Sequence, residues 1–272
     1  MEIIAVANQK GGVGKTTTAV NLAAALAVIG KKKVLLIDLD PQGNATTGAG
    51  LDKNELKKSI VDVLLDETKL HKVIEKNTQA GFDVAGANRD LAGIDMSLSD
   101  VEDAPFLLKK AIELAKKSGK FTYDYVIMDC APSLSILTVN ALVAAKNVII
   151  PMQCEYYALE GVADLIDTIR RLKVINEELH VRGVVRTMFD GRSTLAQDVS
   201  AELENYFGEL LYKTTIPRSV RLAEAPSFGQ SIFGYEKSSK GAIAYHALMN
   251  EVIKQSDEPK LFEAKVRAQF DW

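Results

Sequence analysis

The feature that most constrains the fold is a glycine-rich segment near the start of the chain. Residues 9–17 read Gln-Lys-Gly-Gly-Val-Gly-Lys-Thr-Thr, directly after the apolar run 3–7 and directly before a stretch with helical periodicity. Glycines let backbone N–H groups approach a bound group closely, and the start of a helix adds positive electrostatic potential. This strand–loop–helix context, with its Gly-Lys-Thr ending, predicts a loop that binds phosphate groups.

Each side chain of the loop then has an expected role. We expect Lys15 to reach the β- and γ-phosphates of a nucleotide and the Thr16 hydroxyl to ligate Mg²⁺. The cofactors predicted on this ground are ATP and Mg²⁺. The predicted ATP contacts in the loop are Lys10, Gly11, Gly12, Val13, Gly14, Lys15, Thr16 and Thr17.

Short runs rich in Val and Ile alternate with helical stretches along the chain, which predicts a doubly wound α/β fold with a mostly parallel central sheet. Several runs are apolar on both faces, as expected for strands covered by helices on both sides. The predicted strands are residues 3–7, 33–37, 125–128, 147–151, 182–188 and 211–216. The predicted helices are residues 16–28, 104–117, 135–145, 159–174, 195–206 and 242–254.

The stretch 52–103 is less regular, with one predicted helix at 55–65 and one predicted strand at 82–85. No Pro/Gly/Ser-rich linker isolates it, so we interpret it as an insertion in the same domain. Residues 1–255 are expected to form a single ATPase domain. The pattern breaks after Gln255, and residues 256–272 are expected to be a flexible C-terminal tail.

Composition and charge exclude several classes of protein. The net charge of −3 and the 47% of hydrophobic residues argue against disorder and against a chain that coats DNA by bulk charge. The two cysteines, Cys130 and Cys154, cannot make a disulfide framework, and no residues have zinc-ligand spacing. No apolar run approaches the ~18 residues that span a bilayer. A soluble cytoplasmic protein is therefore expected.

Acidic residues follow two of the predicted strands. Asp38 and Asp40 end the second strand, and Asp129 ends the strand at 125–128. Ligands of open α/β sheets bind at the carboxyl ends of the strands, and residues two apart point the same way. The three carboxylates are therefore expected at one site. Asp38 or Asp40 could instead only cap the turn before Pro41.

The loop departs from the common phosphate-loop pattern at two positions. Gln9 stands where glycine is usual, five residues before Gly14, and the next residue is a second lysine, Lys10. This form resembles the deviant Walker A loop of the MinD/ParA group of ATPases. The resemblance implies a homodimer closed around two ATP molecules, in which Lys10 reaches phosphates bound by the partner subunit. Taken alone, Lys10 could be a solvated loop lysine.

The segment 38–46 resembles the switch I motif of the same group. By that resemblance Asp40 positions or activates the attacking water, Asp38 supports the metal shell, and Asp129 holds a Mg²⁺-bound water or lies near Thr16. The group usually has proline where this chain has Ala131, so we expect a less stiff loop after Asp129.

Further segments, 151–161, 187–192 and 216–229, resemble chromosomal partition ATPases of the ParA/Soj type more than division regulators. In that type the Ile-Pro-Arg segment lies near the adenine, which makes Pro217 a predicted ATP contact. The first strand begins at residue 3, which leaves no room for the N-terminal helix-turn-helix of larger plasmid relatives, so operator binding is not expected.

Arginine placement indicates a DNA role. Most arginines lie between residues 170 and 221, and basic residues of the family at positions matching Arg192, Arg218 and Arg221 bind double-stranded DNA non-specifically. Guanidinium groups pair with phosphates without reading bases. Each of the three could also be an ordinary solvated surface residue. Arg182 and Arg186 flank a central strand, and we interpret them as structural.

The resemblance implies an ATP-dependent switch that dimerises around ATP, binds DNA and hydrolyses ATP slowly under stimulation by a ParB-type partner. Chromosome or plasmid segregation, a nucleoid-associated location and no membrane binding follow from it. One alternative is a MinD-like division regulator that cycles on membranes through a C-terminal amphipathic helix. Another is an iron–sulfur reductase with the same loop, which needs two cysteines facing the dimer axis.

Overall fold

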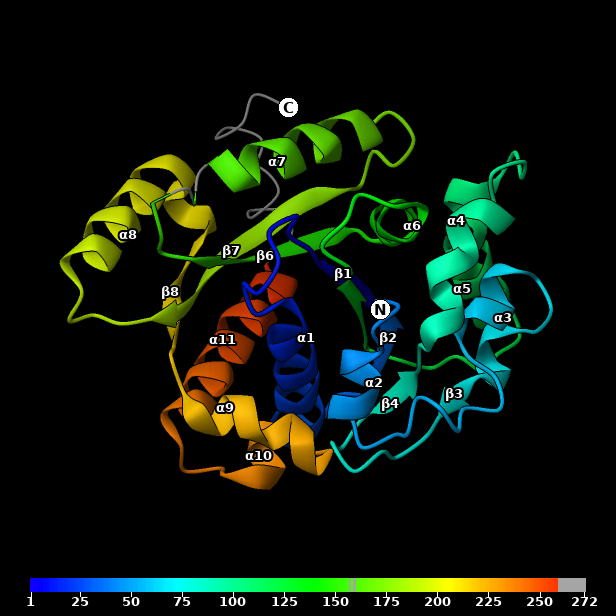
Figure 1. Cartoon of the computed structure of the whole chain (residues 1–272), viewed down its shortest axis with the longest axis horizontal. Coiled ribbons are helices and arrows are strands. Elements are labelled where there is room, and N and C mark those ends of the chain that lie inside the picture. Colours follow the sequence, from blue (N-terminus) through cyan, green and yellow to red (C-terminus); the bar gives the residue numbers. More distant parts are fainter. Residues whose placement is uncertain (157, 159, 259–272) are drawn as a thin grey trace.

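The centre of the computed structural model is one twisted β-sheet (Figure 1). The structure describes residues 1–156, 158 and 160–258, without the side chains of residues 160 and 161. Within these residues the sheet has eight strands in the order β3-β4-β2-β5-β1-β6-β7-β8, all parallel to their neighbours except β3, which is antiparallel to β4. The strands are β1 Glu2–Val6, β2 Val34–Leu39, β3 Ile74–Glu75, β4 Asp83–Ala85, β5 Tyr125–Cys130, β6 Asn147–Gln153, β7 His180–Phe189 and β8 Leu211–Pro217.

Helices cover both faces of the sheet, as the doubly apolar strands predicted. Alternate residues of β1 belong to different cores: Ile4 and Val6 pack in one apolar cluster, and Ala5 packs in the other. The first face carries α1 Lys15–Ala24, α2 Asn44–Gly48, α9 Val220–Glu224, α10 Ile232–Tyr235 and α11 Lys240–Asp257. The second carries α3 Ile60–Leu64, α4 Ile94–Ser97, α5 Leu107–Lys117, α6 Ile136–Ala144, α7 Glu160–Leu172 and α8 Thr194–Phe207. The doubly wound α/β prediction is confirmed.

Two predicted helices differ clearly from those in the structure. The helix expected at 55–65 is only α3, because Ser59 and Asp62 form a capping box that fixes its start at Ile60. The helix expected at 16–28 ends as α-helix at Ala24 and continues as a π-helix over Ala25–Ile29. The short elements α2, β3, α4, α9 and α10 were not predicted, because they are too brief to show a period.

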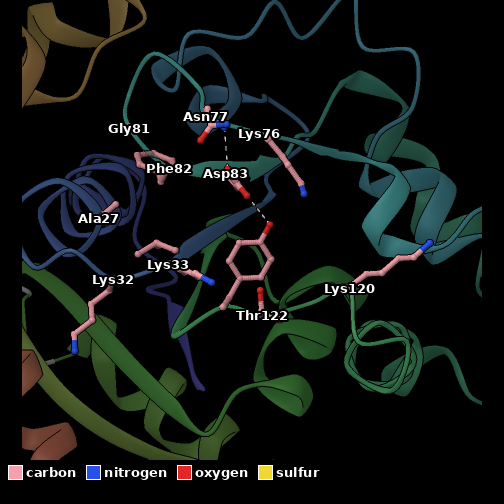
Figure 2. Close-up of a pocket in the computed structure, with 12 residues that line it drawn as sticks. Ala27, Lys32, Lys33, Lys76, Asn77, Gly81, Phe82, Asp83, Lys120 and Thr122 are labelled. Carbon is pink, nitrogen blue, oxygen red and sulfur yellow. Dashed lines mark hydrogen bonds between the residues drawn. The ribbon is translucent and has the colours of Figure 1, made fainter.

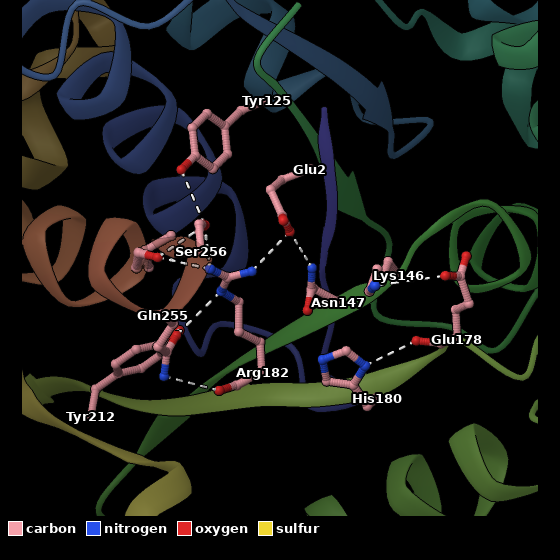
Figure 3. A network of polar contacts seen from close by, with 11 residues as sticks. Glu2, Tyr125, Lys146, Asn147, Glu178, His180, Arg182, Tyr212, Gln255 and Ser256 are labelled. Carbon is pink, nitrogen blue, oxygen red and sulfur yellow. Dashed lines mark hydrogen bonds and ion pairs between the residues drawn. The ribbon is translucent and has the colours of Figure 1, made fainter. Parts of the chain in front are cut away.

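Arg182 and Arg186 are structural, as predicted. Arg182 on β7 is 3% exposed, forms an ion pair with Glu2 of β1 (3.0 Å) and donates to the Val252 carbonyl and the Ser256 hydroxyl of α11 (Figure 3). These contacts join the first strand, an inner strand and the last helix. The predicted tail partly falls in α11, which runs to Asp257, and residues 259–272 lie outside the described part.

Candidate nucleotide site

The predicted phosphate loop connects β1 to α1 at the carboxyl edge of the sheet (Figure 1). Gly12 and Gly14 have φ values of 73° and 87°, a left-handed conformation that favours glycine. Thr187 of β7 supports the loop from the side, because its hydroxyl donates to the Val13 carbonyl at 2.7 Å. The first N–H groups of α1 have no partner within the helix and can donate hydrogen bonds to an anion at this end.

Lys15 is buried within this loop and folds back on it. Its Nζ atom donates to the backbone carbonyl of Lys10 at 2.9 Å, and the residue is only 7% exposed. Burial lowers the pKa of Lys15, while the negative charges of Asp129 and Asp40 oppose that shift. The ammonium group therefore lies in a poorly solvated place where a phosphate oxygen can replace a single neutral acceptor.

Asp129 lies at the end of β5, beside the loop. Its Oδ2 atom accepts a 2.7 Å hydrogen bond from the Thr16 hydroxyl, and its Oδ1 atom is buried with no hydrogen-bond partner in the described residues. Burial raises the pKa of Asp129 well above its usual range, and the neighbouring charge of Asp38 raises it further. A buried carboxylate oxygen without a partner indicates a missing donor or cation.

Asp38 on β2 lies beside Asp129 on the neighbouring strand β5, since the two residues are Cα partners in the β2–β5 register. Its Oδ2 atom accepts from both the backbone N–H (2.8 Å) and the hydroxyl (2.7 Å) of Thr46 on α2, and its Oδ1 atom accepts from the N–H of Asp40 (3.1 Å). Burial raises the pKa of Asp38 to about 6, although these three donors favour the charged form.

Asp40 lies two residues after Asp38, just beyond the end of β2, and is 9% exposed. Its Oδ1 atom accepts from the N–H of Gln42 at 2.8 Å, so it does cap the turn that follows Pro41. Its Oδ2 atom takes part in no hydrogen bond with the described residues and stays available to a ligand. The structure thus gathers Asp38, Asp40 and Asp129 at one edge, beside Lys15.

A Mg²⁺ ion that arrives with a nucleotide fits these residues. Mg²⁺ keeps several waters and takes one or two protein ligands beside the phosphates. The Thr16 hydroxyl and the unpartnered Oδ1 atom of Asp129 supply a direct ligand and an acceptor for a metal-bound water. Among the described residues, no three His, Cys, Asp or Glu side chains are arranged so that they could hold a metal ion by themselves.

The Lys10 side chain contacts a residue outside the phosphate loop. Its Nζ atom forms a 2.7 Å ion pair with Glu155, which follows β6, and the two side chains are 38% and 50% exposed. The N–H of Lys10 donates to the Asn8 side chain, which fixes the backbone at this point. Glu155 was not singled out from the sequence, since nothing local connects residues 10 and 155.

Of the predicted DNA-binding arginines, Arg192 and Arg218 lie on the loops after β7 and β8, and Arg221 lies on α9. Arg192 is 91% exposed and holds Asp190 with two of its nitrogens, at 2.9 and 2.8 Å. These bonds, with the nearby charge of Arg218, lower the pKa of Asp190 to about 2. Arg221 on α9 pairs with Glu224 at 2.9 Å.

Pro217, the predicted adenine contact, ends β8, three strands from β1. It is the register partner of Phe189 on β7, two residues beyond Thr187. Two supporting residues carried no predicted role: Thr46 and Thr187. Both lie within motif segments, but their contacts are made by side chains far from them in sequence.

Both cysteines are buried in the core, and burial raises the pKa of each thiol. They therefore pack as small apolar residues and present no surface pair of the kind the iron–sulfur alternative requires. Among the described residues, no helix combines the length and the apolar character needed to cross a bilayer.

Comparisons with known proteins support the same fold. A family model described as "AAA domain" matches residues 1–181. The sporulation initiation inhibitor protein Soj of Bacillus subtilis is 48% identical over 252 residues, which cover 92% of this chain and 98% of that protein.

Among solved structures, one from Mycobacterium smegmatis, described as cobyrinic acid a,c-diamide synthase with bound ADP and magnesium, has a TM-score of 0.81 at 37% identity and covers 94% of this chain and 96% of that one. The septum site-determining protein MinD of Pyrococcus horikoshii, complexed with Mg-ADP, has a TM-score of 0.74 at 26% identity, with 94% and 97% covered. The chromosome partitioning protein ParA of Caulobacter vibrioides is 43% identical over 256 residues, which cover 94% of this chain and 95% of that protein. The high identity to Soj and ParA over nearly the whole length shows that the chain belongs to the ParA/Soj family of chromosome-partitioning ATPases.

Proposed function

We propose that this chain is an ATP-driven switch for DNA segregation, which binds DNA as an ATP-bound dimer and releases it after hydrolysis. The observation that carries the proposal is the cluster at the phosphate loop. Lys15 lies buried beside Asp129, whose Oδ1 atom has no partner in the described part of the chain, and Thr16 is bonded to the same carboxylate. This set of groups suits a nucleotide that brings its own metal.

Hydrolysis of ATP needs mostly positioning and charge stabilisation from the protein. Lys15 gives up the carbonyl of Lys10 and binds phosphate oxygens, while Asp40 orients the attacking water through its available Oδ2 atom. Asp38, held by Thr46, supports the shell around the metal. Mg²⁺, when bound, supplies neutralising charge at the β- and γ-phosphates.

Dimer formation is the step that requires Lys10 to move. To reach phosphates bound by a second copy of the chain, Lys10 must leave Glu155. An exposed ion pair contributes about 0–1 kcal/mol, so a contact with a phosphate can replace it. The pair therefore keeps Lys10 near its place without preventing dimerisation.

DNA binding in this proposal uses Arg192, Arg218 and Arg221. Asp190 and Glu224 offset part of their charge, so one subunit carries a weak patch. A dimer presents the patch twice. If about 6 phosphates are contacted, the slope of log affinity against log salt concentration is about −5, which makes retention on DNA depend strongly on dimerisation. A ParB-type partner bound at centromere-like sites then stimulates hydrolysis and ends the retention.

The test compares retention on non-specific DNA with ATP and with ADP. We expect the wild-type chain to be retained on DNA with ATP and not with ADP. Lys15→Gln should lose this retention. The control Lys58→Gln, which removes an exposed lysine, should behave like the wild type. Arg192→Gln combined with Arg221→Gln should lose retention and keep the basal ATPase rate, whereas exposed Arg89→Gln should change neither. Equal retention with ATP, with ADP and for Lys15→Gln contradicts the proposal.

A MinD-like membrane cycle is the alternative function. Its predicted anchor would lie in the C-terminal tail, of which residues 259–272 are outside the described part. Liposome flotation with ATP separates the two functions. Strong recovery with anionic vesicles, together with no retention on DNA, favours the membrane cycle. Stimulation of the ATPase rate by DNA plus the N-terminal peptide of a ParB-like protein favours segregation.

A further inference from the structure

A second polar pocket lies at the edge of the sheet opposite the phosphate loop. It has a volume of about 330 Å³ and lies among the loop before β2, the turn between β3 and β4, and the segment before β5. Val34, the first residue of β2, lines it, whereas Asp38 and Asp40 lie toward the other end of that strand. A strand rises about 3.3 Å per residue, so this pocket cannot share a ligand with the nucleotide site.

Lysines dominate the lining of this pocket. Four of them, Lys32, Lys33, Lys76 and Lys120, contribute to its lining (Figure 2). In that view the Lys33 and Lys76 side chains lie on either side of Asp83, whereas the Lys32 and Lys120 side chains extend away at the rim. A concave site lined by one sign of charge concentrates counter-ions from solution.

The one acidic residue of the lining has its carboxylate oxygens occupied. Asp83 accepts from the Tyr123 hydroxyl at Oδ2 (2.7 Å) and from the Asn77 N–H at Oδ1 (2.9 Å). It therefore makes no ion pair with the lysines. Among the described residues none of the four lysines has an acidic partner within ion-pair distance, in contrast to Arg192 and Arg221 in the proposed DNA patch.

The backbone that carries these lysines is held in place. Lys31 has a φ of 55°, and the N–H of Lys32 donates to the Leu26 carbonyl at 3.0 Å, at the end of the π-helix. The N–H of Lys33 donates to Asp124 at 2.7 Å, just before β5. The backbone at Lys32 and Lys33 thus forms a fixed part of the pocket wall.

The geometry points to a binding site for a small molecule that carries two or more adjacent phosphate groups. Lysine ammonium groups bind phosphates as point charges, and a lining with four lysines and one engaged carboxylate calls for a ligand with several negative charges. The volume lies at the lower end of the 300–1,000 Å³ typical of ligand pockets, which suits a compact polyphosphate and excludes a DNA duplex from the interior. Thr122 and Asn77 add neutral donors.

Equilibrium dialysis with labelled inorganic triphosphate tests this site in the full chain. Saturating Mg-ADP keeps the phosphate loop filled, so that only further binding is counted. We expect one additional triphosphate per chain and at least tenfold weaker binding of inorganic phosphate. Lys33→Gln combined with Lys76→Gln should weaken triphosphate binding at least tenfold. The matched pair Lys57→Gln with Lys58→Gln, two exposed lysines outside the pocket, should change it less than twofold.

Three results overturn the inference. The first is no binding beyond Mg-ADP in the wild-type chain. The second is equal weakening in both lysine pairs, which indicates diffuse charge attraction without a site. The third is loss of retention on DNA in the pocket pair with unchanged triphosphate binding, which identifies a nucleic-acid surface. Because Lys33 and Lys76 lie outside the nucleotide site, a negative result here leaves the proposed ATP switch untouched.

Discussion

Replacing Asp38 by asparagine should change how the stability of the nucleotide-free chain depends on pH. Burial raises the pKa of Asp38 to about 6 in the folded chain, against about 3.9 in the unfolded chain. The folded state therefore binds the proton more tightly than the unfolded state. The stability that this proton contributes is fully present below pH ~3.9 and is lost as the pH rises through about 6.

The size of the effect follows from these two values. A difference of about two pKa units corresponds to about 3 kcal/mol, of which about 2 kcal/mol falls between pH 4.5 and pH 8. Asparagine cannot ionise, so the variant lacks this loss. Its amide also places a donor where the carboxylate accepted from Thr46 or Asp40, a cost that is the same at every pH. The change of the stability difference with pH is thus the quantity to measure.

Urea unfolding at pH 4.5 and pH 8, without metal or nucleotide, provides that measurement. The free energy of unfolding of Asp38→Asn, relative to that of the wild type, should be larger by about 2 kcal/mol at pH 8 than at pH 4.5. Asp129 adds to this shift in the same direction, because the charge of Asp38 raises the pKa of Asp129 as well. Asp100→Asn, on an exposed turn, controls for the loss of one charge. A stability difference that does not vary with pH refutes the reasoning.

Two further predictions concern the sheet. Arg182→Met removes one partner of a buried ion pair and should lower the free energy of unfolding by about 3–5 kcal/mol, measured by urea denaturation, whereas exposed Arg170→Met should change it by less than about 1 kcal/mol. Gly183→Ala should cost about 1–3 kcal/mol, because a Cβ there would lie 2.5 Å from the Tyr212 ring. Gly93→Ala, with no atom within 4 Å of its added Cβ, should not show that overpacking cost in a thermal melt, and equal losses in both glycine variants would contradict the packing argument.

The fold class could be predicted from the sequence because its signals are local. The apolar runs of β2 and β5 are buried along their whole length, and the order of strands and helices leaves few ways to cover both faces. The ends of the helices could be predicted less accurately than the fold class. The capping box at Ser59 and the π-helix after Ala24 depend on particular hydrogen bonds that periodicity does not report.

The sequence by itself determined the chemistry available at the nucleotide edge: a glycine loop, Lys15, Thr16 and carboxylates at strand ends. Only the tertiary structure decided which of these groups meet. The β2–β5 register sets Asp38 opposite Asp129. Burial in the closed sheet raises the pKa of both carboxyls, and the charge of Asp38 raises that of Asp129 further. Glu155 holds Lys10 from 145 residues away.

The lysine pocket is another feature that only the tertiary structure decides. Its wall joins the loop before β2, the turn between β3 and β4, and the segment before β5, which are distant in the chain. Short-range patterns encode the propensity of each segment, whereas such contacts arise only when the sheet closes and brings strand ends together. Sequence patterns therefore identify the loop and its acids, and the packing of the sheet sets their charges and their partners.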